Sequence, residues 1–266
     1  MPIRNSIGTD GLDFLEFCTL EPRKLSAQFE SMGFHPVAVH QSHPVTIYQQ
    51  NDIRFIINET PDSQAFQHAK RHGTSICSMG FKVRDADTAL QYVRLKGGTP
   101  YQPLDEKLVY DMPCIYGVGN MLIYFVEYQN KKSNYRNQFS DVSKILPASQ
   151  QLSSLDHLTF NLYRGHMIKW ADYFSKLFNF HEIPHSSSEK KSPTTKSKSM
   201  VSACGKIRMS LSESSSEKSP VETFLNHYNG EGIKHVEFKT NDKLSSPVFL
   251  SILDTIEQKN DEGVIA

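Results

Sequence analysis

Two stretches of the chain alternate apolar and polar residues with the period of a β-strand. Residues 233–240 place His235 and Glu237 on the less apolar side, because successive side chains of a strand point to opposite faces. Residues 155–161 repeat this design with His157. The repeat predicts two sequential modules whose histidines converge on one point. For either histidine alone a hydrogen-bonded structural role is commoner, and two imidazoles bind a metal usefully only when a third ligand completes the geometry.

The first half of the chain contains one order of elements twice. The first copy predicts a strand at 12–20, a helix at 23–32 and strands at 35–40, 44–49 and 53–58. After a polar helix at 62–71, the second copy predicts a strand at 75–83, a helix at 87–95 and strands at 107–110, 114–117 and 121–128. Self-similarity of this kind indicates a repeated fold.

The second half restarts this order and then departs from it. An apolar stripe predicts a helix over 167–178, after a strand at 154–162. The tract at 185–199 is rich in Ser, Lys and Pro, which favours a mobile loop. The pattern then predicts a strand at 202–211, a helix at 220–228, the strand at 233–240 and a helix at 246–259. The chain ends before the three strands expected to close a fourth unit.

Composition argues against several classes of protein. The 266 residues carry 29 Lys plus Arg against 29 Asp plus Glu, so no global charge favours binding to nucleic acid or an anionic membrane. No apolar run approaches the roughly 20 residues that span a bilayer, and the N-terminus lacks the apolar core of a secretion signal. The four cysteines form no CxxC pair, which is typical of reduced thiols in a cytoplasmic protein.

Several segments together resemble the 4-hydroxyphenylpyruvate dioxygenase family of the vicinal oxygen chelate superfamily. The resemblance covers nearly the whole chain and is carried by HGTSICSMGFKVRDA, GVGNMLIYFVEY, LDHLTFNLYRG, WADYFSKLFNF and YNGEGIKHVEF. It implies an α+β fold of tandem βαβββ modules, two per domain, with the last module incomplete here. The expected division is an N-terminal domain at 1–130, a polar connection at 131–151 and a C-terminal iron-site domain at 152–266.

The resemblance also implies a reaction and a metal. The family uses Fe(II), held by two histidines and one carboxylate, to convert 4-hydroxyphenylpyruvate and O₂ into homogentisate and CO₂ in tyrosine catabolism. The 2-oxo acid chelates the metal, and the protein holds the ligands and shapes a dry cavity. The first two metal ligands of the family fall on His157 and His235.

Other family positions differ in this sequence. The third ligand is a Glu from the closing strands that the chain lacks. A family Gln before the second histidine is Lys234 here, a Gln of the short helix is Pro220, and a substrate-site Asn is Ser212. Ser197 keeps the residue type of a substrate-site Ser. Glu237 lies two residues from His235 on the same face, so it is either a substitute ligand or a solvated side chain beside an open cavity.

These differences leave two alternatives. One is an active dioxygenase that obtains the closing strands from elsewhere. The other is a catalytically inactive relative that binds at most a ligand or a partner. The N-terminal domain also offers a surface through which two copies could form a homo-oligomer. On the second alternative, Fe(II) binding and turnover by this chain alone are weak or absent, and the second domain is an open barrel with an exposed apolar sheet face.

Overall fold

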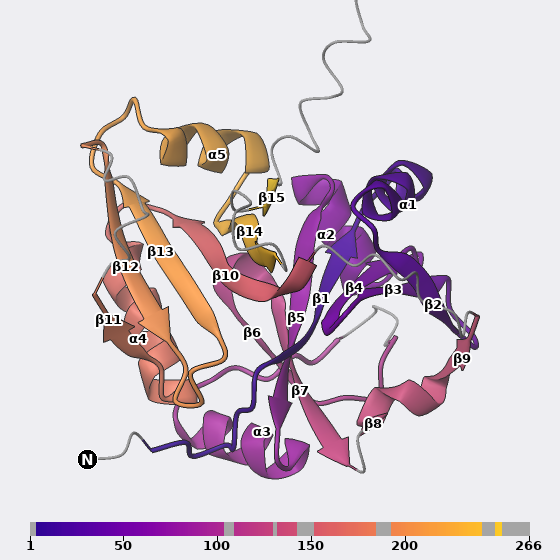
Figure 1. Cartoon of the computed structure of the whole chain (residues 1–266). Helices are drawn as coiled ribbons and strands as arrows, with labels where there is room; N and C mark the ends of the chain where they lie inside the picture. The colour runs from indigo at the N-terminus through magenta and orange to yellow at the C-terminus, as the bar shows by residue number, and fades with distance from the viewer. Residues whose placement is uncertain are drawn as a thin grey trace, which may run out of the picture.

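Two β-sheets lie side by side, one from each half of the chain, in a computed structural model that describes residues 4–103, 109–129, 132–142, 152–184, 193–240 and 248–251 (Figure 1). The fold is α+β, as predicted. Two units have the predicted order of a strand, a helix and three strands, and in each the first strand pairs in parallel with the last. No helix in these described ranges is long and apolar enough to cross a membrane.

The first sheet has nine strands in the order β6-β7-β5-β1-β4-β3-β2-β9, with β8 paired to β7. The strands are β1 (Leu12–Cys18), β2 (His35–His40), β3 (Val45–Gln50), β4 (Ile53–Asn58), β5 (Ser75–Val83), β6 (Cys114–Tyr116), β7 (Leu122–Gln129), β8 (Lys132–Ser133) and β9 (Phe139–Asp141). The helices of this half are α1 (Pro22–Ser31), α2 (Gln64–His72) and α3 (Ala86–Leu95), with short 3₁₀ turns η1 (Val118–Asn120) and η2 (Asn134–Gln138).

The second sheet has six strands in the order β11-β12-β13-β10-β14-β15. They are β10 (Leu152–Leu162), β11 (His181–Ile183), β12 (Thr195–Val201), β13 (Arg208–Ser214), β14 (Gly232–Thr240) and β15 (Val248–Ser251). Helix α4 (His166–Phe178) packs on β12 and β13, and α5 (Pro220–Tyr228) joins β13 to β14 (Figure 1). This sheet carries every metal- and substrate-site residue predicted from the sequence.

Side chains before each helix explain where the helices begin. Ser63 accepts a hydrogen bond from the backbone N–H three residues on and starts α2, and Asp85 does the same for α3. Ser219 caps α5, whose first residue is Pro220, a position where the missing N–H costs little. Helix α4 has no such cap; instead the carboxylate of Glu213 accepts from backbone N–H groups at its N-terminus.

The two sheets repeat one another in register as well as in order. Phe14 of β1 pairs with Gly80 of β5, and His157 of β10 pairs with Glu237 of β14. The sequences LDFLEF and LDHLTF occupy equivalent positions in β1 and β10. A Cβ at Gly80 would lie 2.5 Å from the ring of Phe14. The first sheet therefore places an aromatic ring where the second places an imidazole facing a carboxylate.

One continuous apolar core joins the sheets. Phe34 and Phe55 of the first half contact Phe238 of β14, with ring centroids 6.5 and 6.0 Å apart. Phe81 of β5 packs edge-on against Phe178 of α4 at 5.1 Å. Burying such rings is the main favourable contribution to folding, so the two halves are stabilised together.

The first sheet extends further along the chain than the boundary expected at residue 130. Residues 132–141, predicted to belong to the polar connection, form β8, η2 and β9, and β9 pairs with β2. The reason is Tyr135, which buries its ring beside Phe14 and hydrogen-bonds through its hydroxyl to Asp13 at 2.7 Å. Residues 143–151 and the first half of the predicted strand at 107–110 lie outside the described part of the chain, and residues 109 and 110 are not in a strand. The division into domains stays a prediction.

The Ser- and Lys-rich tract contains a strand, so the prediction of a loop was wrong for part of it. Residues 195–199 belong to β12, which pairs with β11 on one side and β13 on the other. Pairing on both sides satisfies the backbone without an apolar sequence. Residues 185–192 of the tract lie outside the described ranges.

Two further elements differ from the prediction. The strand predicted at 202–211 begins only at Arg208, because Ser202 closes a turn: its backbone N–H donates to the carbonyl of Ile207, and its hydroxyl accepts from the N–H of Ile207. Residues 248–251 of the helix predicted at 246–259 form a strand instead, since β15 pairs antiparallel with β14 and buries Leu250, and residues 246–247 are not described. Residues 252–259 are not described.

Candidate metal and substrate site

Polar side chains stand in three rows across one face of the second sheet. Paired residues of neighbouring strands project to the same face, and rows two residues apart along a strand are roughly 7 Å apart. The first row is Ser197, Ser212, Asn161 and Gly232; the second is Ser199, Ser210, Thr159 and His235; the third is His157 and Glu237. The topology thus brings all the predicted site residues onto one face.

This face is polar and mostly buried, so the prediction of an exposed apolar face was wrong for the described residues. Asn161 is 1% exposed, and the side chains of Thr159, Ser199, Ser210 and Ser212 are buried as well. The error came from β12 and β13, whose residues on this face are mainly serines. A buried polar face must satisfy its donors and acceptors, which suits a surface that binds a polar ligand.

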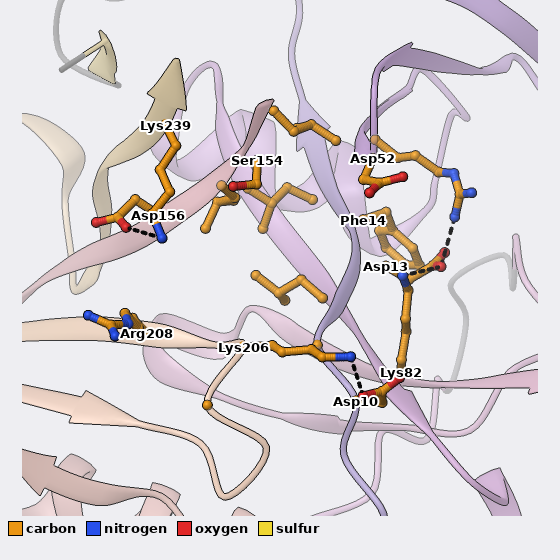
Figure 2. A pocket seen from close by; sticks show the side chains of 17 residues that line it. Asp10, Asp13, Phe14, Asp52, Lys82, Ser154, Asp156, Lys206, Arg208 and Lys239 are labelled. Carbon is orange, nitrogen blue, oxygen red and sulfur yellow. Dashed lines mark hydrogen bonds and ion pairs between the residues drawn. The ribbon is translucent and has the colours of Figure 1, made fainter. Parts of the chain in front are cut away.

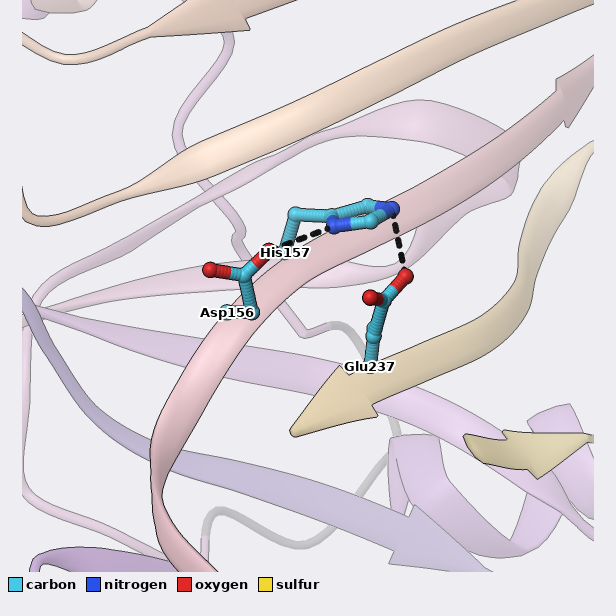
Figure 3. A group of neighbouring side chains, drawn as sticks. All are labelled: Asp156, His157 and Glu237. Carbon is cyan, nitrogen blue, oxygen red and sulfur yellow. Dashed lines mark hydrogen bonds and ion pairs between the residues drawn. The ribbon is translucent and has the colours of Figure 1, made fainter. Parts of the chain in front are cut away.

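The third row holds a compact group of possible metal ligands. Asp156, His157 and Glu237 each offer one ligand atom, and these atoms lie within 4.8 Å of one another. His157 Nδ1 is 3.0 Å from Asp156 Oδ2, and His157 Nε2 is 3.4 Å from Glu237 Oε2 (Figure 3). All three side chains are half-buried. The imidazole therefore lies between two carboxylates, one from its own strand and one from β14.

The electrostatics of the group assign the tautomer of His157. The hydrogen bond from His157, together with the ammonium of Lys239 at 3.1 Å, lowers the pKa of Asp156 to about 2 against the opposing effect of burial. An ionised Asp156 can only accept, so Nδ1 carries the proton and donates to it. In the neutral ring the lone pair of Nε2 then faces the carboxylate of Glu237, which is favourable only with a cation or a proton between them.

The separation of these two atoms fits a shared metal ion. Nitrogen and oxygen ligands lie about 2.1 Å from a divalent first-row metal, so two neighbouring ligands are roughly 3 Å apart. The 3.4 Å between Nε2 and the carboxylate oxygen is close to that value. Asp156 has the place of an outer partner that orients a ligating histidine through its other nitrogen. The donor set of imidazole and carboxylate suits Fe(II), Mn(II) or Zn(II).

His235 lies one row away from this group and is not one of its three members. Burial, followed by the charges of Lys234 and His157, lowers the pKa of His235 to about 4. Its ring is therefore neutral near pH 7, as a metal ligand must be. Thr159, which pairs with His235, lies two residues from His157 in β10, so the two imidazoles are in adjacent rows, and Lys234 is the extra residue of a β-bulge beside them. Pro220, at the position of a family Gln in the short helix, is the first residue of α5.

Sequence reasoning missed two residues of the site. Asp156 is the extra residue of a bulge in β10, so the alternation of the strand gives no sign that it contacts His157. Asn161 lies in the row of Ser197 and Ser212, and its side-chain nitrogen is buried with no hydrogen-bond partner among the residues that the structure describes. The alternation from His157 through Thr159 would have placed Asn161 on this face.

Comparison with known proteins gives the family context. The family model described as hydroxyphenylpyruvate dioxygenase, N-terminal, matches residues 3–140. The chain is 38% identical to hemolysin VllY of Vibrio vulnificus over 98% of its length and 72% of the relative's. It is also 38% identical to 4-hydroxyphenylpyruvate dioxygenase of Legionella pneumophila (strain Corby), over 91% of the chain and 69% of the relative.

A solved structure shows the same architecture. A fusion protein of a xylose isomerase-like TIM barrel and a 4-hydroxyphenylpyruvate dioxygenase matches with a TM-score of 0.74 and 26% identity. The match covers 91% of this chain and 38% of the fusion protein. The two-sheet arrangement is therefore shared with part of a larger chain.

Proposed function

The chain belongs to the hydroxyphenylpyruvate dioxygenase family, and from that premise we propose that its second sheet converts 4-hydroxyphenylpyruvate and O₂ into homogentisate and CO₂. The observation that carries the proposal is the polar face on which His157, His235 and Glu237 stand in adjacent rows. Relatives named 4-hydroxyphenylpyruvate dioxygenase, at 33–38% identity, support the choice of substrate.

His157, His235 and Glu237 would hold an Fe(II) ion. Together they supply two imidazoles and one carboxylate, the donor set of non-haem iron oxygenases. When bound, the ion supplies a centre that chelates the 2-oxo acid and activates O₂. Asp156 keeps the proton on Nδ1 of His157 and so directs Nε2 toward the metal. The sequence suggested Glu237 as a substitute third ligand because it lies on the same strand face as His235. Its carboxylate contacts His157, and this contact supports the role of Glu237 as a ligand.

The row of Ser197, Ser212 and Asn161 would bind the organic substrate. It lies roughly 7 Å from the row of His235, so a molecule the size of an aromatic 2-oxo acid spans the two rows. The unpartnered side-chain nitrogen of Asn161 offers a hydrogen bond that only a ligand or water would complete. Burial of the face excludes bulk water, which protects reactive species formed during turnover.

The test is product formation by purified, Fe(II)-loaded protein. We expect homogentisate, detected by mass spectrometry, from 4-hydroxyphenylpyruvate and O₂ at rates above free iron. His157→Ala and His235→Ala should abolish it, whereas His227→Ala, at an exposed position of α5, should not. Calorimetry with 4-hydroxyphenylpyruvate under nitrogen is the companion measurement. Binding without product would favour the inactive, ligand-binding alternative, and absence of both would contradict the proposal.

We also propose that the protein works in the cytoplasm. The thiols of Cys18, Cys77, Cys114 and Cys204 are all free, and the first three are buried, an arrangement that a reducing compartment preserves. Association of two copies through the first sheet remains a prediction, which sedimentation of the purified protein would test.

A further inference from the structure

A cleft of about 540 Å³ lies between the first and second sheets, beside Asp156 of the candidate metal group. Its walls come from β1, β4 and β5 on one side and from β10, β13 and β14 on the other (Figure 2). Cavities of this size accommodate small organic ligands. The proposed reaction uses Asp156 of its lining but neither its leucines nor Arg208, so the inference below concerns a second site next to the first.

Equivalent residues of the two repeats line the cleft. The registers align Leu15 with Leu158 and therefore Phe55 with Met209, the residues with which they pair. The same alignment gives four equivalent pairs in the walls: Leu12 and Leu155, Asp13 and Asp156, Arg54 and Arg208, and Lys82 and Lys239. The cleft thus lies about the approximate symmetry axis that relates the repeats.

The charges of the first repeat are matched. Asp13 is buried and accepts from Arg54 at 2.8 Å, with the ammonium of Lys82 at 4.0 Å. Its remaining oxygen accepts from the hydroxyl of Tyr135. The two cations of this wall therefore have a carboxylate between them.

The charges of the second repeat are not matched. Asp156 is equivalent to Asp13, but its oxygens pair with His157 and Lys239 instead. Arg208, equivalent to Arg54, is exposed and has no carboxylate partner within the described ranges. Lys206, on the same wall, pairs with Asp10. An arginine that lines a cavity without a partner is available to bind a carboxylate in two-pronged fashion.

The lining of the cleft also contains apolar side chains. Leu12, Leu155, Leu15 and Ile53 all contribute to its lining, between the two charged walls. Asp52 lies on the first repeat's wall, across from Arg208, and repels a second negative group. A ligand that satisfies these surroundings has one anionic end and an uncharged apolar body.

We propose that this cleft binds a small amphipathic carboxylate, its carboxylate against Arg208 and its apolar chain over Leu12 and Leu155. The unmatched guanidinium supplies the charge recognition, and the leucines exclude water from the chain. In the first repeat, Arg54 pairs with the carboxylate of Asp13. In the second, the equivalent Arg208 pairs with the carboxylate of the ligand.

Binding of octanoate, octanamide and octylamine, measured by calorimetry on the full chain, tests the proposal. Octanoate should bind at one saturable site, at least about tenfold more tightly than octanamide, because a charge-assisted hydrogen bond is lost in the amide. Arg208→Gln should weaken octanoate about tenfold or more. The control Arg94→Gln, at an exposed position of α3, should leave its affinity within about twofold.

Two results would overturn the proposal: equal binding of octylamine and octanoate, or an octanoate affinity unchanged in Arg208→Gln. A Ser197→Ala/Ser212→Ala variant distinguishes this site from the proposed substrate face. Octanoate binding should persist in that variant, and its loss there would place the ligand on the polar face and contradict the inference. Circular dichroism of each variant establishes that it is folded.

Discussion

At the scale of single residues, the position of His157 depends on one extra residue in β10. The bulge at Asp156 brings a carboxylate to Nδ1 of His157 while the ring continues to project from the polar face. The equivalent bulge in β1 places Asp13 among cations instead. The same backbone feature thus serves a candidate metal site in one repeat and a buried ion pair in the other.

The first prediction concerns Glu237. Glu237→Gln keeps the shape of the side chain but removes the charge that faces His157 Nε2, so affinity for Fe(II) or Co(II) should fall at least about tenfold. Titration monitored by the Co(II) absorption spectrum measures it. Glu182→Gln on β11, whose carboxylate pairs with Lys198 at the surface, is the control. Equal metal affinity in Glu237→Gln and wild type would mean that Glu237 is not a ligand.

The second prediction concerns Asn161. Its side-chain nitrogen has no partner in the free protein, so Asn161→Ala should remove a hydrogen bond to the ligand without removing one within the fold. Affinity for 4-hydroxyphenylpyruvate, measured anaerobically, should fall about five- to tenfold. Asn137→Ala, at an exposed position of η2, serves as control. A variant that binds as tightly as wild type would show that water alone satisfies this amide.

At the scale of elements, β1 and β10 differ in what they bury. Glu16 of β1 occupies the place of Thr159 and lies beneath Asn58, Tyr110 and Ser78, all of which hydrogen-bond to its carboxyl group. Burial raises the pKa of Glu16, although these hydrogen bonds oppose the effect. The first sheet therefore buries a carboxyl group at the position where the second sheet has a residue of the candidate site.

The third prediction follows from Glu16. The folded state keeps a proton that the unfolded chain loses above pH 4.5, so the free energy of unfolding should decrease as pH rises toward the folded pKa. The decrease is about 1.4 kcal/mol per pH unit for one group. Glu16→Gln stays neutral and should lack this component in urea unfolding between pH 5 and 8. Parallel pH profiles for wild type and Glu16→Gln, with Glu217→Gln as exposed control, would contradict it.

The strands of the second sheet differ in how well the sequence predicts them. Residues 157–161 of β10 and 235–238 of β14 alternate regularly between the bulges, so their faces and both histidines followed from the sequence, and the helix predicted at 220–228 is α5. The strand β12 could not be recognised, because its face is serine and its other side is partly lysine. Neither Asp156 nor the contact of Glu237 with His157 could be predicted, since both depend on bulges and on strand pairing between distant segments.

At the scale of the whole molecule, an aromatic residue joins the halves. Tyr228, the last residue of α5, is fully buried against α2 of the first half. Its hydroxyl lies 3.0 Å from His68 Nε2, and its carbonyl accepts from His72 Nδ1 at 2.7 Å. The ring of His72 stacks on that of Tyr228, with centroids 4.6 Å apart. Two neutral imidazoles of the first half therefore contact Tyr228 of the second half.

The last prediction is that acid weakens this contact. Burial, with smaller effects of His72 and Arg71, lowers the pKa of His68 to about 3 from 6.5, so the unfolded chain binds a proton that the folded protein excludes. The stabilising contribution is complete above pH 6.5 and is lost as pH falls toward 3, by about 1.4 kcal/mol per pH unit. The pKa of His72 is also lowered, chiefly by burial, so it adds to the same dependence.

His68→Gln keeps a donor for the hydroxyl of Tyr228 and cannot be protonated. The slope of unfolding free energy against pH, measured with urea between pH 6 and 4.5, should therefore be shallower than in wild type. The difference should be the contribution of one bound proton, about 1.4 kcal/mol per pH unit. His227→Gln, which removes an exposed histidine of α5, should keep the wild-type slope. If His68→Gln loses stability with acid as steeply as wild type, the proton uptake must belong to other groups, and the contact between the repeats would not be the part of the molecule that acid opens.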